Sequence, residues 1–481
     1  MTLQIFITLH MEATLLEKWI DKEKRVASLL KRRYLHFDRF IDFEKNQKKI
    51  IRELSNVKLI EEHSFYPFIK TTVETPRYKP RTDENGQKIR VLESKLRPIA
   101  YASHFDALIY SWYSTILTKA YEDQLDSWKI RDCVLAYLAT GKSNIDYSFE
   151  IFNYISHLPQ CAAIGIDVSS FFDNLDHEIL KGMWAKTLKE SKLPADHFNI
   201  YKSLTSYSTV PKFTLDDIFA YKLPNNRYCS PDEFRKYVRQ GKLIEKNANL
   251  NLIPTSSRYK KQCGIPQGSP ISSVLSNIYM IDFDMKMNKL AKNNTAVYRR
   301  YCDDIIVICE IDKVQLFQNE LLGLALRNEL TINPSKTEIT YFTKTTNKLR
   351  GYKESSFTNF RNLQYLGFEF NGENVYIRAS SISRYKRRIA SEIRECLKAA
   401  NGNNSISNIV FKKKLLKRFS SKGKRNFISY AIRAANNIMN SQSIKKQYNN
   451  SIDNVLNTFK YKQAKFNQKL IGKKKQPKAH K

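Results

Sequence analysis

The sequence predicts an α+β fold, in which an antiparallel or mixed sheet is backed by helices. From about Cys161 onward, short apolar runs typical of strands alternate with longer segments whose apolar residues recur three and four apart. One stretch reads as strand, two acids, strand, which is the pattern of a hairpin and favours antiparallel pairing. The chain of 481 residues is long enough for about two to four domains or subdomains.

The first 125 residues read as two helical regions that flank a hairpin. Residues 12–60 contain no Gly or Pro and place apolar residues at helical spacing, so we expect them to be helical. The Asn85-Gly86 pair then indicates a turn between two short basic strands. Residues 103–125 again show the helical pattern.

Acidic residues follow two of the strand patterns. An apolar run over residues 162–168 is long enough for a buried strand, which ends at Asp167. Residues 296–311 predict a hairpin with Asp303 and Asp304 at its tip. The patterns that follow predict a helix over 316–330 and strands over 336–342 and 363–370.

A second pair of adjacent acids, Asp216 and Asp217, has a structural interpretation. Thr214 lies three residues before Asp217, as in a capping box, and acids in a first helical turn are favoured by the helix dipole. Ser230 and Glu233 indicate another helix start in the same way. Neither segment points to catalysis.

The net charge of +34 is unevenly placed along the chain. Residues 381–481 contain 26 Lys and Arg against 3 acids, so +23 of the charge lies in the last fifth of the sequence. Such an excess points to a polyanionic partner. The last dozen residues fit a solvated basic tail, whereas the segments before them place apolar residues at helical spacing beside cations. This spacing favours basic helices that hold nucleic acid.

The cysteines and the N-terminal residues indicate in which cellular compartment the protein is found. The seven cysteines form no CxxC pair, so neither a disulfide framework nor a structural zinc site is expected. Residues 1–11 are apolar, but they lack a basic front and a cleavage site and are too short to span a bilayer. We therefore expect a cytoplasmic protein without a membrane partner.

The acids at 303 and 304 are candidates for metal binding. Adjacent carboxylates repel each other unless a cation or strong donors lie between them. Two divalent ions about 3.5–4 Å apart can activate a 3′-hydroxyl and stabilise a leaving pyrophosphate, but they need a further carboxylate from a neighbouring strand. Asp167 is the candidate for that ligand. Its alternative role is to cap the turn that follows its strand.

The stretch Gln267-Gly268-Ser269-Pro270 reads as a turn that opens a helix. Gly268 would let the backbone approach a ligand closely, while Ser269 and Pro270 suit an N-cap and a first helical position. Such a loop could hold a nucleotide against a base pair.

Six sequence blocks occur in order between residues 90 and 370. They are RVLESKLRPIAY, IDVSSFFDNLDH, GIPQGSPISSVLSN, YCDDIIV, NPSKTEI and YLGFEF. In this order they resemble the fingers segment and motifs A to E of reverse transcriptases. The resemblance covers more than half of the chain and implies a right-hand polymerase fold with fingers, palm and thumb.

The resemblance implies a metal site built from motifs A and C. Asp167 and Asp303 would bind the catalytic ions and Asp304 would complete the acidic cluster. The main-chain carbonyl of Val168 would help to hold the ion that accompanies the nucleotide. The implied cofactor is two Mg²⁺ ions, with Mn²⁺ as the alternative.

The resemblance also implies a nucleotide-binding set. Arg97 would hold the incoming triphosphate, with Lys95 as a weaker candidate for the same role. Phe172 matches the residue that crowds a 2′-hydroxyl, so the substrate would be a deoxynucleoside triphosphate. Gln267 would lie over the nascent base pair. Lys336 matches a possible proton donor to pyrophosphate, although a solvated surface Lys is the alternative.

The implied domains follow the order of the blocks. Residues 1–70 form an N-terminal helical region, and residues 71–372 form the fingers and palm, with an insertion at about 185–260. Residues 373–481 form the basic helical thumb and C-terminal tail. Tyr365, Leu366 and Gly367 would form the primer grip between palm and thumb.

The resemblance implies RNA-directed DNA synthesis by a two-metal mechanism, with an RNA template and a DNA product. The sequence shows no RNase H-like acidic cluster and no endonuclease module after the thumb, and its layout is similar to that of bacterial antiphage reverse transcriptases. That subgroup would copy a partner non-coding RNA. The alternatives are a group II intron or retron-type enzyme, or a non-catalytic, maturase-like RNA-binding protein. A homo-oligomer is left open.

Overall fold

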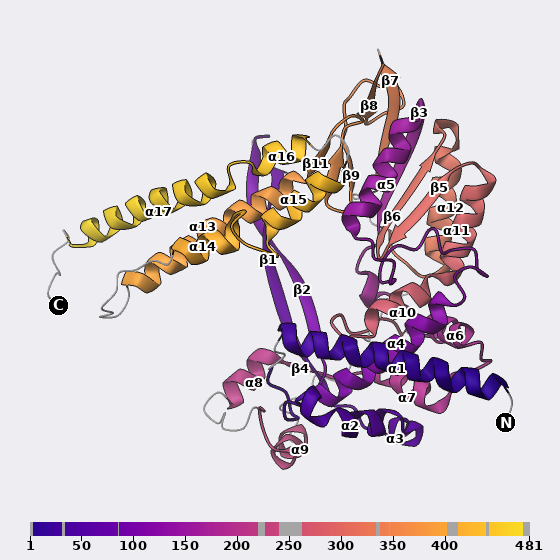
Figure 1. Ribbon diagram of the computed structural model, residues 1–481. Helices are drawn as coiled ribbons and strands as arrows, with labels where there is room; N and C mark the ends of the chain where they lie inside the picture. Colours follow the sequence, from indigo (N-terminus) through magenta and orange to yellow (C-terminus); the bar gives the residue numbers. More distant parts are fainter. Residues whose placement is uncertain are drawn as a thin grey trace.

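The computed structural model confirms the α+β class (Figure 1). It describes residues 3–30, 34–84, 86–219, 227–239, 262–332, 337–345, 347–401, 412–438 and 442–474. It contains a five-stranded sheet, a set of C-terminal helices that extends away from this sheet, and a long hairpin that runs from the N-terminal helices to the C-terminal helices (Figure 1).

The central sheet is antiparallel throughout, with the strand order β5-β6-β3-β7-β8. Its strands are β3 (Gln160–Asp167), β5 (Val297–Tyr301), β6 (Asp304–Cys309), β7 (Glu338–Thr345) and β8 (Lys348–Tyr352). Side chains alternate between the two faces of a strand. In β3, Ala162 and Ile164 therefore join one hydrophobic core, whereas Cys161 and Ala163 join the other. Both faces are buried, which explains why the strand reads as a continuous apolar run.

Helices cover both faces of this sheet. The first face packs against α4 (His104–Glu122), α6 (His177–Leu188), α10 (Ser272–Tyr279), α11 (Ile281–Asn293) and α12 (Val314–Arg327). The second face packs against α5 (Asn144–His157), α15 (Phe427–Asn437) and a three-stranded sheet of β9 (Leu363–Tyr365), β10 (Phe368–Phe370) and β11 (Val375–Ile377). Two short 3₁₀ helices, η1 (Phe171–Asp173) and η2 (Ile311–Lys313), follow β3 and β6.

The N-terminal region is helical but interrupted, so the expectation of one helical stretch over 12–60 was only partly right. It contains α1 (Leu3–Leu30), α2 (Phe43–Leu54) and α3 (Val57–Glu61). Asp42 begins α2, because its carboxylate accepts a hydrogen bond from the Lys45 amide at 3.3 Å. Apolar spacing alone does not reveal such a cap.

The hairpin before the sheet is much longer than the two short strands that the sequence predicts. β1 (Phe68–Thr82) pairs with β2 (Lys88–Tyr101) from Ile69 onward, along the whole length of β2. The ribbon extends from the N-terminal helices to the C-terminal helices (Figure 1), where the Arg387 guanidinium donates to the Pro76 carbonyl at 3.4 Å.

The segment predicted as an insertion forms α7 (Ala195–Thr205), β4 (Thr209–Pro211), α8 (Lys212–Phe219) and α9 (Pro231–Arg239) within its described residues. The Ser230 and Glu233 capping pair is confirmed, with each side chain accepting the other's amide. The Thr214 cap was wrong, since α8 begins two residues earlier. Asp216 instead accepts hydrogen bonds from Lys212 at 2.6 Å and from the Tyr228 hydroxyl at 2.9 Å.

The C-terminal part is helical, as expected. It consists of α13 (Ala379–Asn401), α14 (Lys412–Phe419), α15, α16 (Gln442–Tyr448) and α17 (Ser451–Lys474). α13 and α17 lie side by side and share a small core that includes Ile393, Leu415 and Phe459 (Figure 1). Tyr461, by contrast, is 61% exposed. Within the described ranges, no helix combines the length and the apolar composition that a membrane crossing requires.

Candidate active site

The three candidate acids meet where β3 and β6 are paired. Asp167 is the last residue of β3, Asp304 is the first residue of β6, and the two are cross-strand partners. Asp303 precedes Asp304 in the turn, and its carbonyl accepts a hydrogen bond from the Val168 amide at 3.3 Å. Strand register therefore brings together two segments that are more than a hundred residues apart in the sequence.

The turn that carries Asp303 is strained. Cys302 and Asp303 connect β5 to β6, and Cys302 has a φ of 57°, which non-glycine residues seldom adopt. Burial, followed by the charge of Asp303, raises the pKa of the Cys302 thiol to about 11. The thiol is therefore protonated at neutral pH. The Tyr137 hydroxyl contacts its sulfur at 3.5 Å.

The chemistry of these residues fits a magnesium site. Carboxylate and carbonyl oxygens are the ligands that Mg²⁺ prefers. Within the described residues, no three His, Cys, Asp or Glu side chains lie close enough together to form a metal site as they stand. The backbone thus brings the acids together at one edge of the sheet, while the side chains are not arranged around a common point. Asp167, Asp303 and Asp304 would hold the ion.

Motifs A and B are joined by backbone hydrogen bonds. The Phe172 carbonyl accepts from the Ile265 amide at 2.9 Å, and the Leu175 carbonyl accepts from the Gly264 amide at 2.8 Å. The His177 ring is 2.8 Å from the Gly264 carbonyl, so this histidine adds a further contact between the two motifs. These bonds hold the backbone of Phe172, whose side chain is half-buried, beside the irregular segment that leads to Gln267.

The motif B loop is attached to the long hairpin. The Gln267 carbonyl accepts from the Ala100 amide of β2 at 2.8 Å, and Gly268 lies against the same residue with a φ of 121°. The expected Ser269 cap was wrong, because α10 begins at Ser272 and its N-cap, Ile271, makes no side-chain bond. The Ser269 hydroxyl is buried and has no hydrogen-bond partner among the described residues.

The two nucleotide-binding candidates of the hairpin lie on one face of β2. Arg97 and Lys95 are two residues apart, so their side chains leave the same side of the ribbon. Arg97 is half-buried and Lys95 is exposed. The bond between Ala100 and Gln267 places this face next to the motif B loop. Lys336 lies outside the described residues.

The primer-grip candidates form the turn between β9 and β10. Tyr365 pairs with Phe368, and the two turn residues, Leu366 and Gly367, have φ values of 45° and 93°. Positive φ at both positions is typical of a type I′ hairpin. Asn144 donates to the Leu366 carbonyl at 3.0 Å. Burial, and then the charge of Asp304, raise the pKa of the Tyr365 hydroxyl, so this turn lies within electrostatic reach of the acids.

The sequence analysis missed a buried ion pair next to the acids. Arg300 and Asp284 both have fully buried side chains, and Arg300 lies three residues before Asp303. The signal available in the sequence was the Arg299-Arg300 pair inside a strand pattern, because an arginine that faces a core needs a partner. Nothing in the sequence identified Asp284 as that partner.

Residues 108–370 match the family model described as reverse transcriptase (RNA-dependent DNA polymerase). The match covers more than half of the chain and contains the three acids and the motif B loop. The chain therefore belongs to the reverse transcriptase family, a class of nucleotidyltransferases.

Among solved structures, the chain is similar to yeast telomerases. For apo telomerase from Candida tropicalis truncated from its C-terminal domain, the identity is 12% and the TM-score 0.39, over 70% of this chain and 61% of that chain. For telomerase from Candida albicans with a TWJ fragment of telomeric RNA, the identity is 12% and the TM-score 0.35, over 87% of this chain and 65% of that chain. For the corresponding Candida tropicalis complex, the identity is 14% and the TM-score 0.34, over 89% of this chain and 58% of that chain. The chain thus spans less than two thirds of each, and we draw no functional argument from these likenesses.

Proposed function

We propose that this protein is an RNA-directed DNA polymerase that adds deoxynucleotides to a primer on an RNA template. The observation that supports this most directly is the register of β3 and β6, which pairs Asp167 with Asp304 and adds Asp303 from the turn. Because the chain belongs to the reverse transcriptase family, we interpret these acids as metal ligands for DNA synthesis. Two bound Mg²⁺ ions would activate the primer 3′-hydroxyl and stabilise the leaving pyrophosphate.

The chain's own residues have three roles in this proposal. Asp167, Asp303 and Asp304 supply negative charge and oxygen ligands at the point where the chain-extending bond forms. Arg97 orients the triphosphate through its planar guanidinium, which matches phosphate oxygens in pairs. Phe172 excludes a 2′-hydroxyl by its bulk, so deoxynucleotides are selected.

A basic pocket supports the nucleic-acid side of the proposal. It has a volume of about 610 Å³ and lies between α13, α14, the loop before α15 and the primer-grip turn. Six cations line it, namely Arg384, Arg388, Lys417, Arg418, Lys424 and Arg425, together with Gly367 of the turn. No acid lines it among the described residues. We propose that it follows the phosphates of the strand leaving the active site, which makes residues 373–481 the thumb.

A more specific proposal concerns the biological role of the enzyme and its RNA partner. We propose a cytoplasmic enzyme of bacterial antiphage defence that copies a non-coding RNA partner, with residues 1–70 and the insertion at about 185–260 as additions to the fingers and palm. Intron-encoded and retron-type enzymes share the same chemistry, so the identity of the bound RNA distinguishes them. Sequencing the nucleic acid that copurifies with the protein would identify the template and the mode of priming.

The activity is tested by primer extension with the purified full-length chain. With an RNA template, a DNA primer, deoxynucleotides and Mg²⁺, the wild type should extend the primer, and omission of Mg²⁺ should stop the extension. The double substitution Asp303→Ala, Asp304→Ala should reduce extension to background, because it removes two of the three proposed ligands, while RNA binding persists.

The second Asp-Asp pair provides the matched control. Asp216→Ala, Asp217→Ala also removes two adjacent carboxylates, here from α8. Asp216 accepts hydrogen bonds from Lys212 and Tyr228, which both lie in the segment predicted as an insertion. This variant should leave extension unchanged. Full activity in the 303/304 variant would contradict the assignment of the acids. Absence of extension by the wild type on every primed template would contradict the proposed activity itself.

A further inference from the structure

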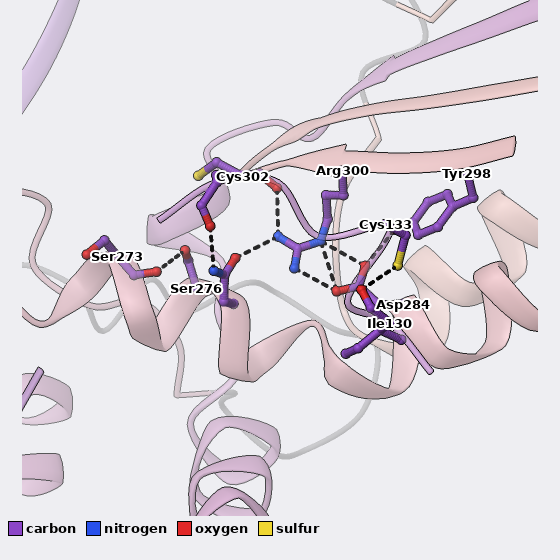
Figure 2. A network of polar contacts seen from close by, with 10 residues as sticks. Ile130, Cys133, Ser273, Ser276, Asp284, Tyr298, Arg300 and Cys302 are labelled. Carbon is purple, nitrogen blue, oxygen red and sulfur yellow. Dashed lines mark hydrogen bonds and ion pairs between the residues drawn. The ribbon is translucent and has the colours of Figure 1, made fainter. Parts of the chain in front are cut away.

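Arg300 of β5 lies at the centre of a buried polar network (Figure 2). Its Nε donates to Oδ1 of Asp284 at 2.8 Å, and its Nη2 donates to Oδ2 at 2.6 Å. The Tyr298 hydroxyl donates to the same carboxylate at 2.6 Å. Asn277 of α10 accepts from Nη1 of Arg300 at 3.1 Å. Asp284 lies on α11, so the network ties the strand to two helices.

The position of this charge is unusual. Arginine is seldom fully buried, and a buried ion pair forms without net cost only when its geometry and its remaining hydrogen bonds are good. Burial by itself would lower the pKa of Arg300, but the Asp284 charge and its hydrogen bonds raise the pKa above the ordinary value. Arg300 therefore stays charged, and its hydrogen bonds to Asp284 have good geometry.

The network acts directly on the turn between β5 and β6. Nη1 of Arg300 also donates to the Cys302 carbonyl at 3.2 Å. The next carbonyl, that of Asp303, accepts from the Val168 amide at 3.3 Å. Both carbonyls of the two-residue turn are thus held by hydrogen bonds, one from a buried cation and one from Val168, the residue that follows β3. This restraint can maintain the positive φ of Cys302.

The same arginine holds a second segment against the turn. Its amide donates to the Cys133 carbonyl at 2.8 Å, and its carbonyl accepts from the Leu135 amide at 2.9 Å. Asn277 donates to the Ala136 carbonyl at 2.9 Å. The segment then reaches Tyr137, whose hydroxyl contacts the Cys302 sulfur. The turn is therefore enclosed from the side opposite β6.

We propose that Arg300 is a positioning residue, which fixes Asp303 for metal binding by holding the Cys302 carbonyl from inside the core. The inference rests on the proposed function, because it assigns Arg300 a role in the chemistry performed by Asp303. Its consequence is specific. Loosening the turn should weaken metal binding and turnover, while template binding, which takes place on other surfaces, should not change.

The test is Arg300→Lys in the full-length chain. Lysine keeps a positive charge beside Asp284, but it cannot serve Asp284, Asn277 and the Cys302 carbonyl at the same time. We expect kcat to fall about tenfold or more and the Mg²⁺ concentration for half-maximal activity to rise, as is found when residues behind metal ligands are altered. The KM for the deoxynucleotide and the Kd for the RNA should stay near the wild-type values.

A matched control separates positioning from stability. The Tyr113 hydroxyl donates to Asp196 at 2.6 Å in a buried site that joins α4 to α7. Tyr113→Phe should lower the melting temperature without moving the Mg²⁺ requirement. Asn277→Ala removes the acceptor that orients Nη1 of Arg300 while keeping the ion pair, and it should reproduce the Arg300→Lys signature if the lysine variant does not fold.

The inference fails if the Arg300 and Asn277 variants lose activity only in proportion to their unfolded fraction, with an unchanged Mg²⁺ requirement. In that case wild-type extension still supports the proposed function. A wild type that does not synthesise DNA contradicts the proposed function instead, so the two failures are distinguishable.

Discussion

At the residue scale, backbone strain is found in each of the three segments around the proposed reaction centre. Ser170 after β3, Cys302 before Asp303 and Leu366 in the primer-grip turn have φ values of 46°, 57° and 45°. Non-glycine residues in this region cost about 1–3 kcal/mol each and persist only where the surroundings hold them. The hydrogen bonds to the carbonyls of Cys302, Asp303 and Leu366 are such restraints at two of these segments.

Phe172 permits a prediction about sugar selection. Its backbone is held beside the motif B segment by the bond between its carbonyl and the Ile265 amide, so a smaller side chain should leave space where a 2′-hydroxyl would lie. Phe172→Val should reduce the preference for deoxynucleotides over ribonucleotides by about 10- to 100-fold in kcat/KM. Single-nucleotide incorporation with each triphosphate measures this ratio.

Phe198→Val is the control for loss of an aromatic ring at a partly exposed site, since Phe198 is 43% exposed on α7. It should leave the ratio unchanged. A Phe172→Val enzyme that still rejects ribonucleotides as strongly as the wild type would contradict the steric role.

At the scale of elements, the motif B loop and β2 form one unit. The amide of Ala100 binds the carbonyl of Gln267, and Gly268 allows the two backbones to approach. A Cβ at position 268 would lie 2.8 Å from the Ala100 carbonyl oxygen and 2.8 Å from Cγ2 of Ile99. The position of Gln267 thus depends on the strand that also carries Arg97.

Gly268→Ala should therefore disturb nucleotide binding. The added methyl would push the loop away from β2, and the φ of 121° adds backbone strain. We expect the free energy of unfolding to fall by about 1–3 kcal/mol and the KM for the nucleotide to rise. Denaturant unfolding and steady-state kinetics measure the two effects.

Gly141→Ala is the matched control, because Gly141 also has a positive φ of 71° but nothing within 4 Å of its Cβ position. It should show a similar loss of stability with an unchanged KM. Equal KM values in the two variants would show that the contact with β2 does not position the loop.

At the scale of the whole molecule, positive charge is concentrated in the basic pocket between the C-terminal helices and the primer-grip turn. The long hairpin runs from the N-terminal helices to the C-terminal helices (Figure 1), and the basic pocket lies beside the primer-grip turn. Most of its cations are not neutralised within the pocket, although Arg418 pairs with Glu392. A nucleic-acid backbone would supply the missing charge.

The basic pocket predicts a salt-dependent contact. Lys424→Gln, Arg425→Gln should weaken RNA binding and make the slope of log K against log salt shallower by about 1–2. Fewer phosphates are then contacted, so fewer counterions are released when the RNA binds. Titrations at several salt concentrations give this slope. Lys119→Gln, Arg131→Gln removes two cations that are already paired with Asp123 and Asp126, and it should leave the slope unchanged. Identical slopes in both variants would contradict the role of the pocket.

The limits of sequence reasoning are visible at particular residues. The Ser230 cap was predicted correctly because both partners lie within one turn. The caps at Thr214 and Ser269 were wrong, since α8 follows directly on β4, which pairs with β1, and the motif B loop is held by its contact with β2. The hairpin strands were predicted too short, because Pro76 and Pro80 suggest interruption, although a two-stranded ribbon tolerates proline on its open edges.

The sequence by itself determined the α+β class, the family and the strand ends where Asp167, Asp303 and Asp304 occur, because these follow from local apolar patterns and ordered motifs. Only the tertiary structure decided which strands pair, how β2 meets the motif B loop and which acid neutralises Arg300. These depend on contacts between residues far apart in the chain. A buried charge shows in the sequence that it needs a partner, but only the packed fold supplies one.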